Sequence, residues 1–565
     1  MKKWLKENSI FLIASVFILI FGFESSRWEK QKIIDNDVAI YYAYLPAALI
    51  YHDLTFEFTK NIPPESKKKI WTIYDHEKNI RMLKMPMGVA ILHTPFFAVG
   101  HVVALLSDFK ADGYTPPYQA AVFFSTLFYV LFGLFFLRKL LNRHFSEKIT
   151  NWTLIIIILG TNLFYYSSVT PGMSHPYSFC VIAGFLYFTE LWHEKANWKR
   201  SFIVGLLFGF IVLIRPSNII IVFVFLLYGV YSKAAIKTKI DYFKKNYLQL
   251  ILITIISLII VSPQVIYWKL ITGDWYYYTY GDEGFFFNDP KFINGLFSFR
   301  KGWLIYTPIM TFSLIGMLFL RRKKEYLTAI PLTTLFALYI IFSWWAWWYG
   351  GGFSSRPMID YYGLLAIPLA LFIHEIFSGK KILKVVFSTI ILLLISLNIW
   401  QSYQYKKGIL HYDGMTKEAY IKLFFAKHYP KYYNEIIDRP DYKMMKQNVE
   451  ISQSDYENQL SGKDLDFYRF CTASRIVRKS LQREKILPEE SIYSKLLIII
   501  KNKESYPEYY DLIVEKAKRK IEKRIKHNDK KMSKLIKKAN QENTTPELQV
   551  KNHADSIFNK KFGEN

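Results

Sequence analysis

The chain contains little cysteine and lacks the short motifs that mark several common enzyme classes. Its 565 residues include two cysteines. Cys180 lies inside an apolar run and Cys471 in the charged tail, and neither has a CxxC or metal-ligand neighbour. The sequence has no HExxH, P-loop or GxSxG motif and no zinc-ligand spacing. These absences argue against a disulfide framework, intramembrane metalloproteolysis, ATP-driven transport and serine hydrolysis.

Glycine and proline are scarce in the C-terminal tail, and no internal repeat or low-complexity linker is evident along the chain. Apolar residues recur at helical spacing over 506–525 and 530–539, amid many lysines. We therefore expect a helical tail, which we interpret as a solvated cap. A partner-binding role, or a basic face resting on anionic lipid head groups, stays open.

Hydrophobic residues make up 52% of the chain and aromatic residues 18%, and both are unevenly distributed. Nearly all long apolar runs precede residue 400, and the rest is charged. Tyr and Trp favour membrane interfaces, and an apolar run of about 20 residues can cross a bilayer. The sequence therefore predicts an all-α protein with a polytopic membrane domain over 1–400 and a basic helical domain over 401–565.

The net charge of +27 does not by itself indicate nucleic acid, because many Lys and Arg lie in short loops between apolar runs. There they set membrane topology. The first apolar segment, residues 9–23, has the layout of a signal peptide but is not followed by a small-x-small cleavage pattern. We interpret it as an uncleaved first helix with a cytoplasmic N-terminus.

The basic loops predict about eleven transmembrane helices. A crossing at 87–106 would put Arg138 and Lys139 outside, against the positive-inside bias, so we expect this run to lie in the outer interface. Two large extracytoplasmic loops follow from this topology, 26–115 with interfacial helices and 271–302. The tail also falls on the outer side.

The apolar run over 202–232 should break at Arg215. The next residue is proline, which disfavours the α conformation at the residue before it and removes a backbone donor. Each half of the run is short. We therefore predict a hairpin that dips to the outer side of the membrane.

An acidic segment follows the first apolar run. Asp35 and Asp37 precede Tyr41 and Tyr44. Placing a carboxylate near hydrocarbon costs free energy, so the carboxylates found there usually have a function. Two interpretations are open. Asp-Asn-Asp is a good helix-start signature, and either acid could instead be a general base that takes a proton from an acceptor hydroxyl or amine.

Several cations are expected on the outer side, where the positive-inside bias makes them less common. Arg300 and Lys301 stand at the entrance of a span, where they could snorkel or bind an anion such as a lipid phosphate. Arg356 precedes a proline, as Arg215 does, so these two could converge on one phosphate. Alternatively, Arg356 forms a structural ion pair with Asp360.

Together these segments resemble the GT-C superfamily of integral membrane glycosyltransferases, near the protein O-mannosyltransferases and the lipid A aminoarabinose transferases. The sequence is also similar to uncharacterised GT-C-like proteins of Bacteroidetes. The resemblance covers residues 1 to about 400, and the segments that carry it are 35–46, 84–88, 214–218, 299–308 and 355–362.

The resemblance implies an enzyme of the bacterial inner membrane. It would transfer a sugar from polyprenyl phosphate to a lipid, glycan or protein acceptor on the extracytoplasmic side. Asp37 or Asp35 would deprotonate the acceptor, which attacks the anomeric carbon with inversion. The cations that would hold the leaving phosphate, where charge develops, are Arg215, Arg300, Lys301 and Arg356.

The resemblance also implies further substrate contacts, but it leaves two points open. The residues expected to contact substrate are Tyr41, Tyr44, Lys84, His175, Asp282, Glu283 and Asp360. The Asp-Asn-Asp sequence departs from the Asp-Glu pair of the relatives, so the choice between the two acids stays open. Some relatives use a divalent metal and others none, and the sequence offers no clear ligand set.

Two other functions compete with the transferase. A transporter or flippase for a lipid-linked envelope precursor would suit the interrupted helix at Arg215, but there is no inverted repeat and the polar residues concentrate in outer loops. A non-catalytic subunit of an envelope complex would use the tail as its binding element.

Overall fold

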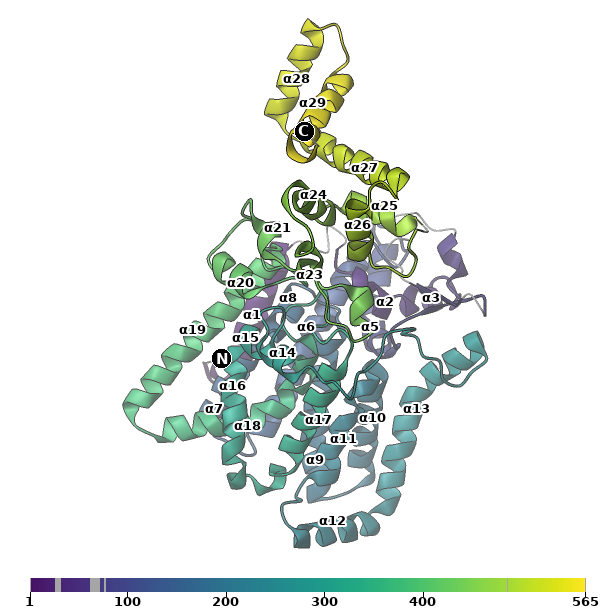
Figure 1. Cartoon of the computed structure of the whole chain (residues 1–565). Helices are drawn as coiled ribbons and strands as arrows, with labels where there is room; N and C mark the ends of the chain where they lie inside the picture. Colours follow the sequence, from purple (N-terminus) through teal and green to yellow (C-terminus); the bar gives the residue numbers. More distant parts are fainter. Residues whose placement is uncertain (1, 26–31, 61–71, 76–77, 485, 564–565) are drawn as a thin grey trace. The chain divides into compact units, whose positions relative to one another are not determined.

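The computed structural model describes residues 2–25, 32–60, 72–75, 78–484 and 486–563, and its regular secondary structure is almost wholly helical (Figure 1). Parts of the predicted first outer loop therefore lie outside the described residues. Contacts divide the chain into two compact units, Met1–Gly408 and Ile409–Asn565. Each is described by itself.

Unit 1 is a helical bundle with one short β-hairpin. Its α-helices are α1 (Lys2–Ser25), α2 (Asn36–Tyr42), α3 (Tyr44–Leu49), α5 (Gly88–Leu105), α6 (Pro116–Leu141), α7 (Glu147–Leu159), α8 (Leu163–Ser168), α9 (Ser174–Glu194), α10 (Trp198–Ile214), α11 (Val222–Leu227), α12 (Lys233–Lys245), α13 (Tyr247–Thr272), α14 (Phe292–Phe297), α15 (Trp303–Tyr306), α16 (Thr311–Gly316), α17 (Ala329–Ser343), α18 (Tyr362–Ser378) and α19 (Lys381–Lys406). Its 3-10 helices are η1 (Glu57–Lys60), η2 (Pro216–Ile221), η3 (Pro308–Met310), η4 (Met317–Arg322), η5 (Lys324–Tyr326) and η6 (Arg356–Tyr361). The antiparallel strands are β1 (Thr72–Asp75) and β2 (Ile80–Leu83).

The described residues hold six helices that are long and apolar enough to cross a membrane. They are Gly88–Leu105, Pro116–Leu141, Tyr247–Thr272, Lys324–Ser343, Arg356–Ser378 and Lys381–Lys406. Such a set indicates a multi-pass membrane protein. The count of about eleven crossings stays a prediction.

Helix α9 is buried along most of its length and separates two polar regions. At about 1.5 Å per residue it is long enough to cross the hydrocarbon core of a bilayer. His175, in its first turn, and Glu190, just before its last turn, are both fully buried. These two side chains mark opposite ends of unit 1.

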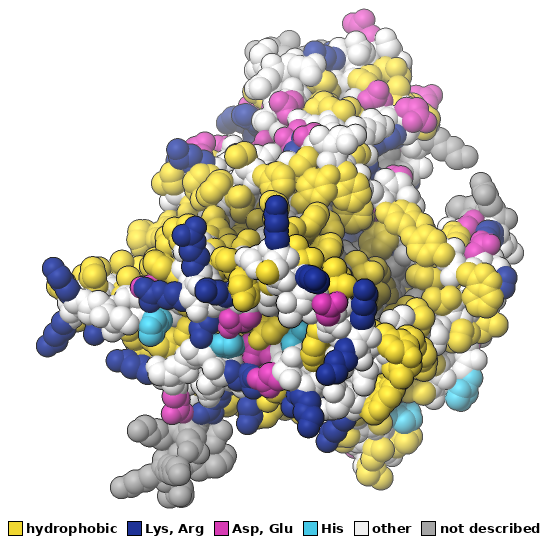
Figure 2. Space-filling model, turned by 90° about the horizontal axis from the view of Figure 1, so that it is seen from below, with side chains coloured by type: hydrophobic (Ala, Val, Ile, Leu, Met, Phe, Trp, Pro, Cys, Tyr) yellow, Lys and Arg dark blue, Asp and Glu magenta, His cyan; other side chains and the backbone are white. Residues whose placement is uncertain are grey.

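Loops that the sequence predicts to be cytoplasmic meet at the Glu190 end of α9. Arg143 Nε lies 2.6 Å from Glu190 Oε2, and His144 and Tyr326 bind the other carboxylate oxygen. Glu194 also pairs with Arg143. Figure 2 views unit 1 from this end and shows Lys and Arg side chains spread over the face. We call it the basic end.

The predicted helix break at Arg215 is confirmed. Arg215 is extended, with φ −149° and ψ 104°, between α10 and η2. The chain then returns toward its starting point, because the rings of Tyr228 and His193 lie 5.0 Å apart. Residues 198–228 thus form a helical hairpin whose tip carries Arg215, as predicted. The membrane side of that tip stays a prediction.

Helix α5 lies near the tip of this hairpin. A Cβ at Gly88 would approach the backbone nitrogen of Ile214 to 2.7 Å, so the two backbones touch. Further along, Tyr129 of α6 donates a hydrogen bond to the Leu92 carbonyl at 3.0 Å. Helix α5 therefore packs along the half of α6 that is remote from the basic end. The helix is nevertheless long and apolar enough to cross a membrane, so the predicted interfacial placement stays a prediction.

One buried lysine holds α12 against the basic end. The ammonium group of Lys239 contacts the carbonyls of Phe225 and Tyr228 at 3.2 and 2.9 Å, and Nε2 of His193. Nδ1 of His193 lies 2.7 Å from the Thr189 carbonyl, which only accepts, so Nδ1 carries the proton and Nε2 accepts. All three ammonium protons thus have acceptors.

We expect Lys239→Met to destabilise unit 1. Methionine can fill the space of the lysine stem, but it leaves two carbonyls and an imidazole nitrogen without a donor, and each buried unpaired group costs about 1–3 kcal/mol. Differential scanning fluorimetry in detergent should report a melting temperature several degrees lower. Lys237→Met, at an exposed position of the same helix, is the matched control. Equal melting temperatures for the two variants would contradict this interpretation of Lys239.

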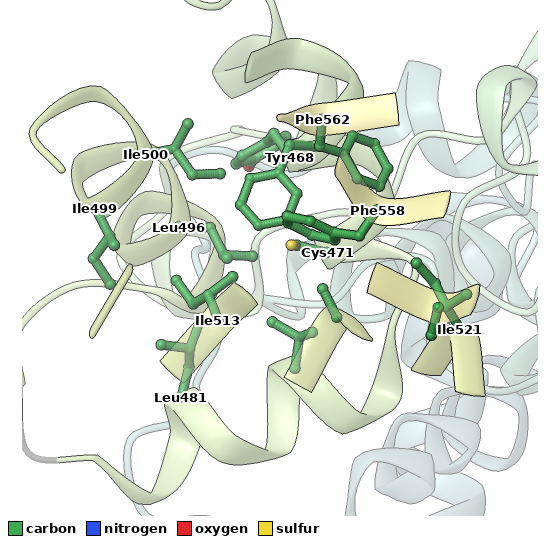
Figure 3. Packing of buried hydrophobic residues seen from close by; sticks show 14 of the residues in the cluster. Tyr468, Cys471, Leu481, Leu496, Ile499, Ile500, Ile513, Ile521, Phe558 and Phe562 are labelled. Atoms are coloured by element: carbon green, nitrogen blue, oxygen red, sulfur yellow. The ribbon is translucent and has the colours of Figure 1, made fainter. Parts of the chain in front are cut away.

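Unit 2 has its own hydrophobic core (Figure 3). Tyr468, Cys471, Leu496, Ile513 and Phe558 belong to it, and the Cys471 thiol is buried and unbridged. The predicted helices over 506–525 and 530–539 are confirmed by α27 and α28. The helices are α20 (Lys417–Leu423), α21 (Tyr433–Ile436), α22 (Tyr442–Met445), α23 (Gln453–Glu457), α24 (Gly462–Thr472), α25 (Arg475–Arg483), α26 (Ile492–Lys501), α27 (Pro507–Lys526), α28 (Asp529–Gln541) and α29 (Pro546–Phe562).

Candidate functional site

The two acids after the first helix have different environments. Asp35 is the N-cap of α2, and its carboxylate accepts a hydrogen bond from the backbone N–H of Asn36 at 3.0 Å. Asp37 lies in the first turn of α2, and its Oδ2 is 2.8 Å from Nη1 of Arg356. The helix-start interpretation therefore fits Asp35. Asp37 is paired with a residue from a distant part of the chain.

A fully buried carboxylate lies at the centre of the site. Nδ1 of His175 is 2.8 Å from Oδ1 of Asp360, and Nδ2 of Asn218 is 2.8 Å from Oδ2. Nε of Arg215 forms an ion pair with Oδ2 at 3.2 Å. Since a buried charge is costly unless it is paired, Asp360 holds these partners together. The alternative pair of Arg356 with Asp360 is not formed, because Arg356 pairs with Asp37.

Helix breaks position both arginines. Arg215 caps the end of α10 and is followed by Pro216, the first residue of η2, whereas Arg356 is the first residue of η6 and Pro357 the second. The loop before Arg356 is also constrained. A Cβ at Gly352 would lie 2.8 Å from the Tyr166 hydroxyl and 3.0 Å from Cδ of Arg356, so only glycine fits without displacement.

The other two predicted cations contact the loop that leads to Arg356. Lys301 is 2% exposed and donates a hydrogen bond to the carbonyl of Gly352. The guanidinium carbon of Arg300 lies 5.5 Å from the centre of a ring of Trp348, within cation–π range. Arg300 and Lys301 thus support the loop over 344–355, whereas Arg215 and Arg356 bind the two carboxylates.

Buried tyrosines surround these pairs. Burial raises the pKa of Tyr41, although the nearby Arg215 opposes the shift. Burial also raises the pKa values of Tyr280 and Tyr349, both of which are close enough to Arg215 to interact electrostatically with it. Desolvation disfavours the phenolate. The hydroxyls therefore stay protonated; that of Tyr349 donates to the Ile341 carbonyl at 2.9 Å and that of Tyr280 to Sδ of Met85 at 3.3 Å.

The first and second predicted outer loops meet beside the site. Nζ of Lys84 lies 2.6 Å from Oε1 of Glu283 and 4.7 Å from the ring centre of Tyr280. Asp282 is exposed next to this pair. Tyr44 instead donates to the carbonyl of Met85 at 2.9 Å. Lys84 and Glu283 thus flank the site, while the hydroxyl of Tyr44 is used in packing.

The sequence interpretation missed three residues of the site. Asn218 lies three residues after Arg215, so a polar side chain next to a predicted helix break was the available signal. Tyr280 and Tyr349 lie in loops rich in aromatic residues, and nothing in the pattern separates them from interfacial neighbours. Over the described parts of the chain, no group of three or more His, Cys, Asp or Glu side chains could hold a metal ion.

Comparison with known proteins identifies no relative, so any functional conclusion rests on the geometry of the site. No protein-family model matches the chain, and no curated protein is significantly similar to it. The chemistry must therefore be argued from the cluster of Asp37, Arg356, Arg215, Asp360 and His175. It offers one partly exposed carboxylate and two guanidinium groups, a set suited to proton transfer and to binding an anion.

We expect the two ion pairs to differ in their effect on stability. Arg215→Met leaves a carboxylate with no exposed surface, and removing one partner of such a pair costs about 3–5 kcal/mol. Arg356→Met leaves Asp37, whose side chain is 28% exposed and can be hydrated. Thermal unfolding of the purified protein should therefore show a clearly larger loss for Arg215→Met. Equal losses, or a larger loss for Arg356→Met, would contradict the central role of Asp360.

Proposed function

We propose that this chain is a membrane glycosyltransferase that moves a sugar from a polyprenyl-phosphate donor to a lipid, glycan or protein acceptor. The observation that carries the proposal is the convergence of Asp37 with Arg356 and, beside them, Arg215. A general base and the cations that hold a leaving phosphate must reach the same anomeric carbon. Three distant chain segments supply these groups at one end of the bundle.

The proposed site opens to the extracytoplasmic side of a bacterial inner membrane. His175, which contacts Asp360, begins α9, whereas the cation-rich loops lie at the other end of this helix. The positive-inside bias puts such loops in the cytoplasm. A donor whose phosphate lies at the outer leaflet would then meet the arginines without passing the basic end.

In the proposed reaction, the Asp37 carboxylate takes a proton from the acceptor hydroxyl or amine. The acceptor atom attacks the anomeric carbon with inversion, and the bond from that carbon to the phosphate oxygen breaks. Polyprenyl phosphate leaves with the bonding electron pair. Arg356 and Arg215 stabilise the charge that develops on it, which is where catalysis gains most.

Because Asp37 is paired with Arg356, the proposed mechanism requires the donor to bind before Asp37 can act as a base. The phosphodiester of the donor carries one negative charge, as a carboxylate does, and its two free oxygens can accept two hydrogen bonds from one guanidinium group. Donor phosphate therefore competes with Asp37 for Arg356. Donor binding releases the carboxylate oxygens, which then can accept the proton of the acceptor.

A transporter or flippase of a lipid-linked precursor is the second candidate. The hairpin that breaks at Arg215 favours it, because interrupted helices with ionic groups at the break often build transport sites. Such a protein would bind the same phosphate but would move the lipid across the bilayer without forming a product.

A sugar-transfer assay distinguishes a transferase from a transporter or flippase. Membranes that contain the wild-type protein should transfer radiolabelled sugar from a panel of undecaprenyl-phosphate sugars to an acceptor. Asp37→Asn should lower the rate by about 100-fold or more, the scale expected for losing a general base. Asp35→Asn, which changes only the helix cap, should keep most of it. Full activity of Asp37→Asn, or lipid movement without transfer, would contradict the transferase.

Binding of the leaving group tests the competition for Arg356. Undecaprenyl phosphate should bind Asp37→Asn several-fold more tightly than wild type, because a neutral amide competes less well for the guanidinium group. Arg356→Gln should bind it more weakly than wild type. Microscale thermophoresis in detergent can measure all three affinities. Weaker binding by Asp37→Asn would show that Asp37 supports the phosphate rather than competing with it.

A further inference from the structure

Helix α12 carries a short apolar stripe beside a row of lysines. Ile236 and Ile240 are 47% and 48% exposed. With about 100° between successive residues of an α-helix, these two side chains share one strip of the surface. Lys233, Lys237 and Lys244 are also exposed and share the next strip, about 60° further round the axis.

Lys239 fixes the direction in which these strips face. Its buried ammonium group is held by two carbonyls and a histidine, so α12 cannot rotate about its axis without breaking that contact. Lys239 lies about 80° from the centre of the apolar stripe, on the side opposite to the lysine row. The stripe therefore points sideways out of the protein, and the lysines point further from it.

Helix α12 lies at the basic end of unit 1, directly before a candidate membrane span. Figure 1 shows α12 lying across the basic end, below α11 and joined to α13. Helix α13, a candidate span, begins directly after it and exposes Leu248, Ile251 and Ile255, each by nearly half. A helix that crosses a membrane begins at the interface. With α13 as a span, the apolar stripe lies at the level where the head groups meet the acyl chains.

We propose that α12 is an interfacial helix that binds the head groups of anionic phospholipids in the leaflet at the basic end. Ile236 and Ile240 enter the acyl boundary, and Lys233, Lys237 and Lys244 contact the phosphate groups beside it. An amphipathic helix with lysines flanking its apolar face has the composition of such surface-bound segments, and lysines attract anionic leaflets. This surface is separate from the transferase site and does not depend on its chemistry.

Quenching by brominated lipids tests the proposal on the full-length protein. Ile240→Cys and Thr238→Cys are each labelled with the fluorophore NBD and reconstituted in phosphatidylcholine bilayers. Position 238 lies on the same helix about 160° from position 240, facing away from the stripe. Cys180 and Cys471 are buried, so wild type treated with the same reagent gives the background signal.

Two comparisons decide the outcome. Quenching at position 240 should exceed that at 238 several-fold, and brominated phosphatidylglycerol should quench position 240 more than an equal fraction of brominated phosphatidylcholine. Replacing Lys233, Lys237 and Lys244 by glutamine should remove that excess. Equal quenching at 238 and 240 would overturn the proposal in favour of solvent or a protein partner. Equal quenching by the two lipids would overturn the selectivity for anionic head groups.

Discussion

The buried carboxylate of Asp360 is the constraint on which the rest of the site depends. A charge without exposed surface must be surrounded by donors or opposite charge. Here His175 at the start of α9 and Asn218 at the hairpin tip contact it within hydrogen-bond distance, and Arg215 supplies the opposite charge. Satisfying one side chain therefore brings three elements together. Arg356, one helical turn before Asp360, is left to pair with Asp37, and the first loop joins the site.

The length of α9 separates this site from a second polar cluster of different character. At the far end Glu190 is also buried, but its partners tie together loops that are rich in lysine and arginine. Both clusters contain a partly exposed ion pair, but the site pairs its two carboxylates with two arginines, whereas Glu190 and Glu194 at the far end share Arg143. This asymmetry is consistent with the proposed reaction at the Asp360 end and the proposed lipid-binding surface at the basic end.

Local sequence patterns predicted helices and helix breaks better than they predicted which side chains contact one another across the fold. The break at Arg215 follows from the proline after it, and the tail helices follow from apolar spacing, so both were predictable. The pair of Asp37 with Arg356 joins segments far apart in the chain, and no local pattern specifies it. The same holds for Asn218, whose role depends on a carboxylate from another helix. The GT-C resemblance implied roles for Asp37 and Arg356 but did not specify that they pair with each other.

The most direct test of the account is a cryo-electron microscopy structure of the protein with undecaprenyl phosphate. The proposed mechanism predicts a phosphate within hydrogen-bond distance of Arg356 and Arg215, with the Asp37 carboxylate moved off Arg356 toward open space. A phosphate bound at the basic end, or bound while Asp37 and Arg356 remain paired, would contradict it.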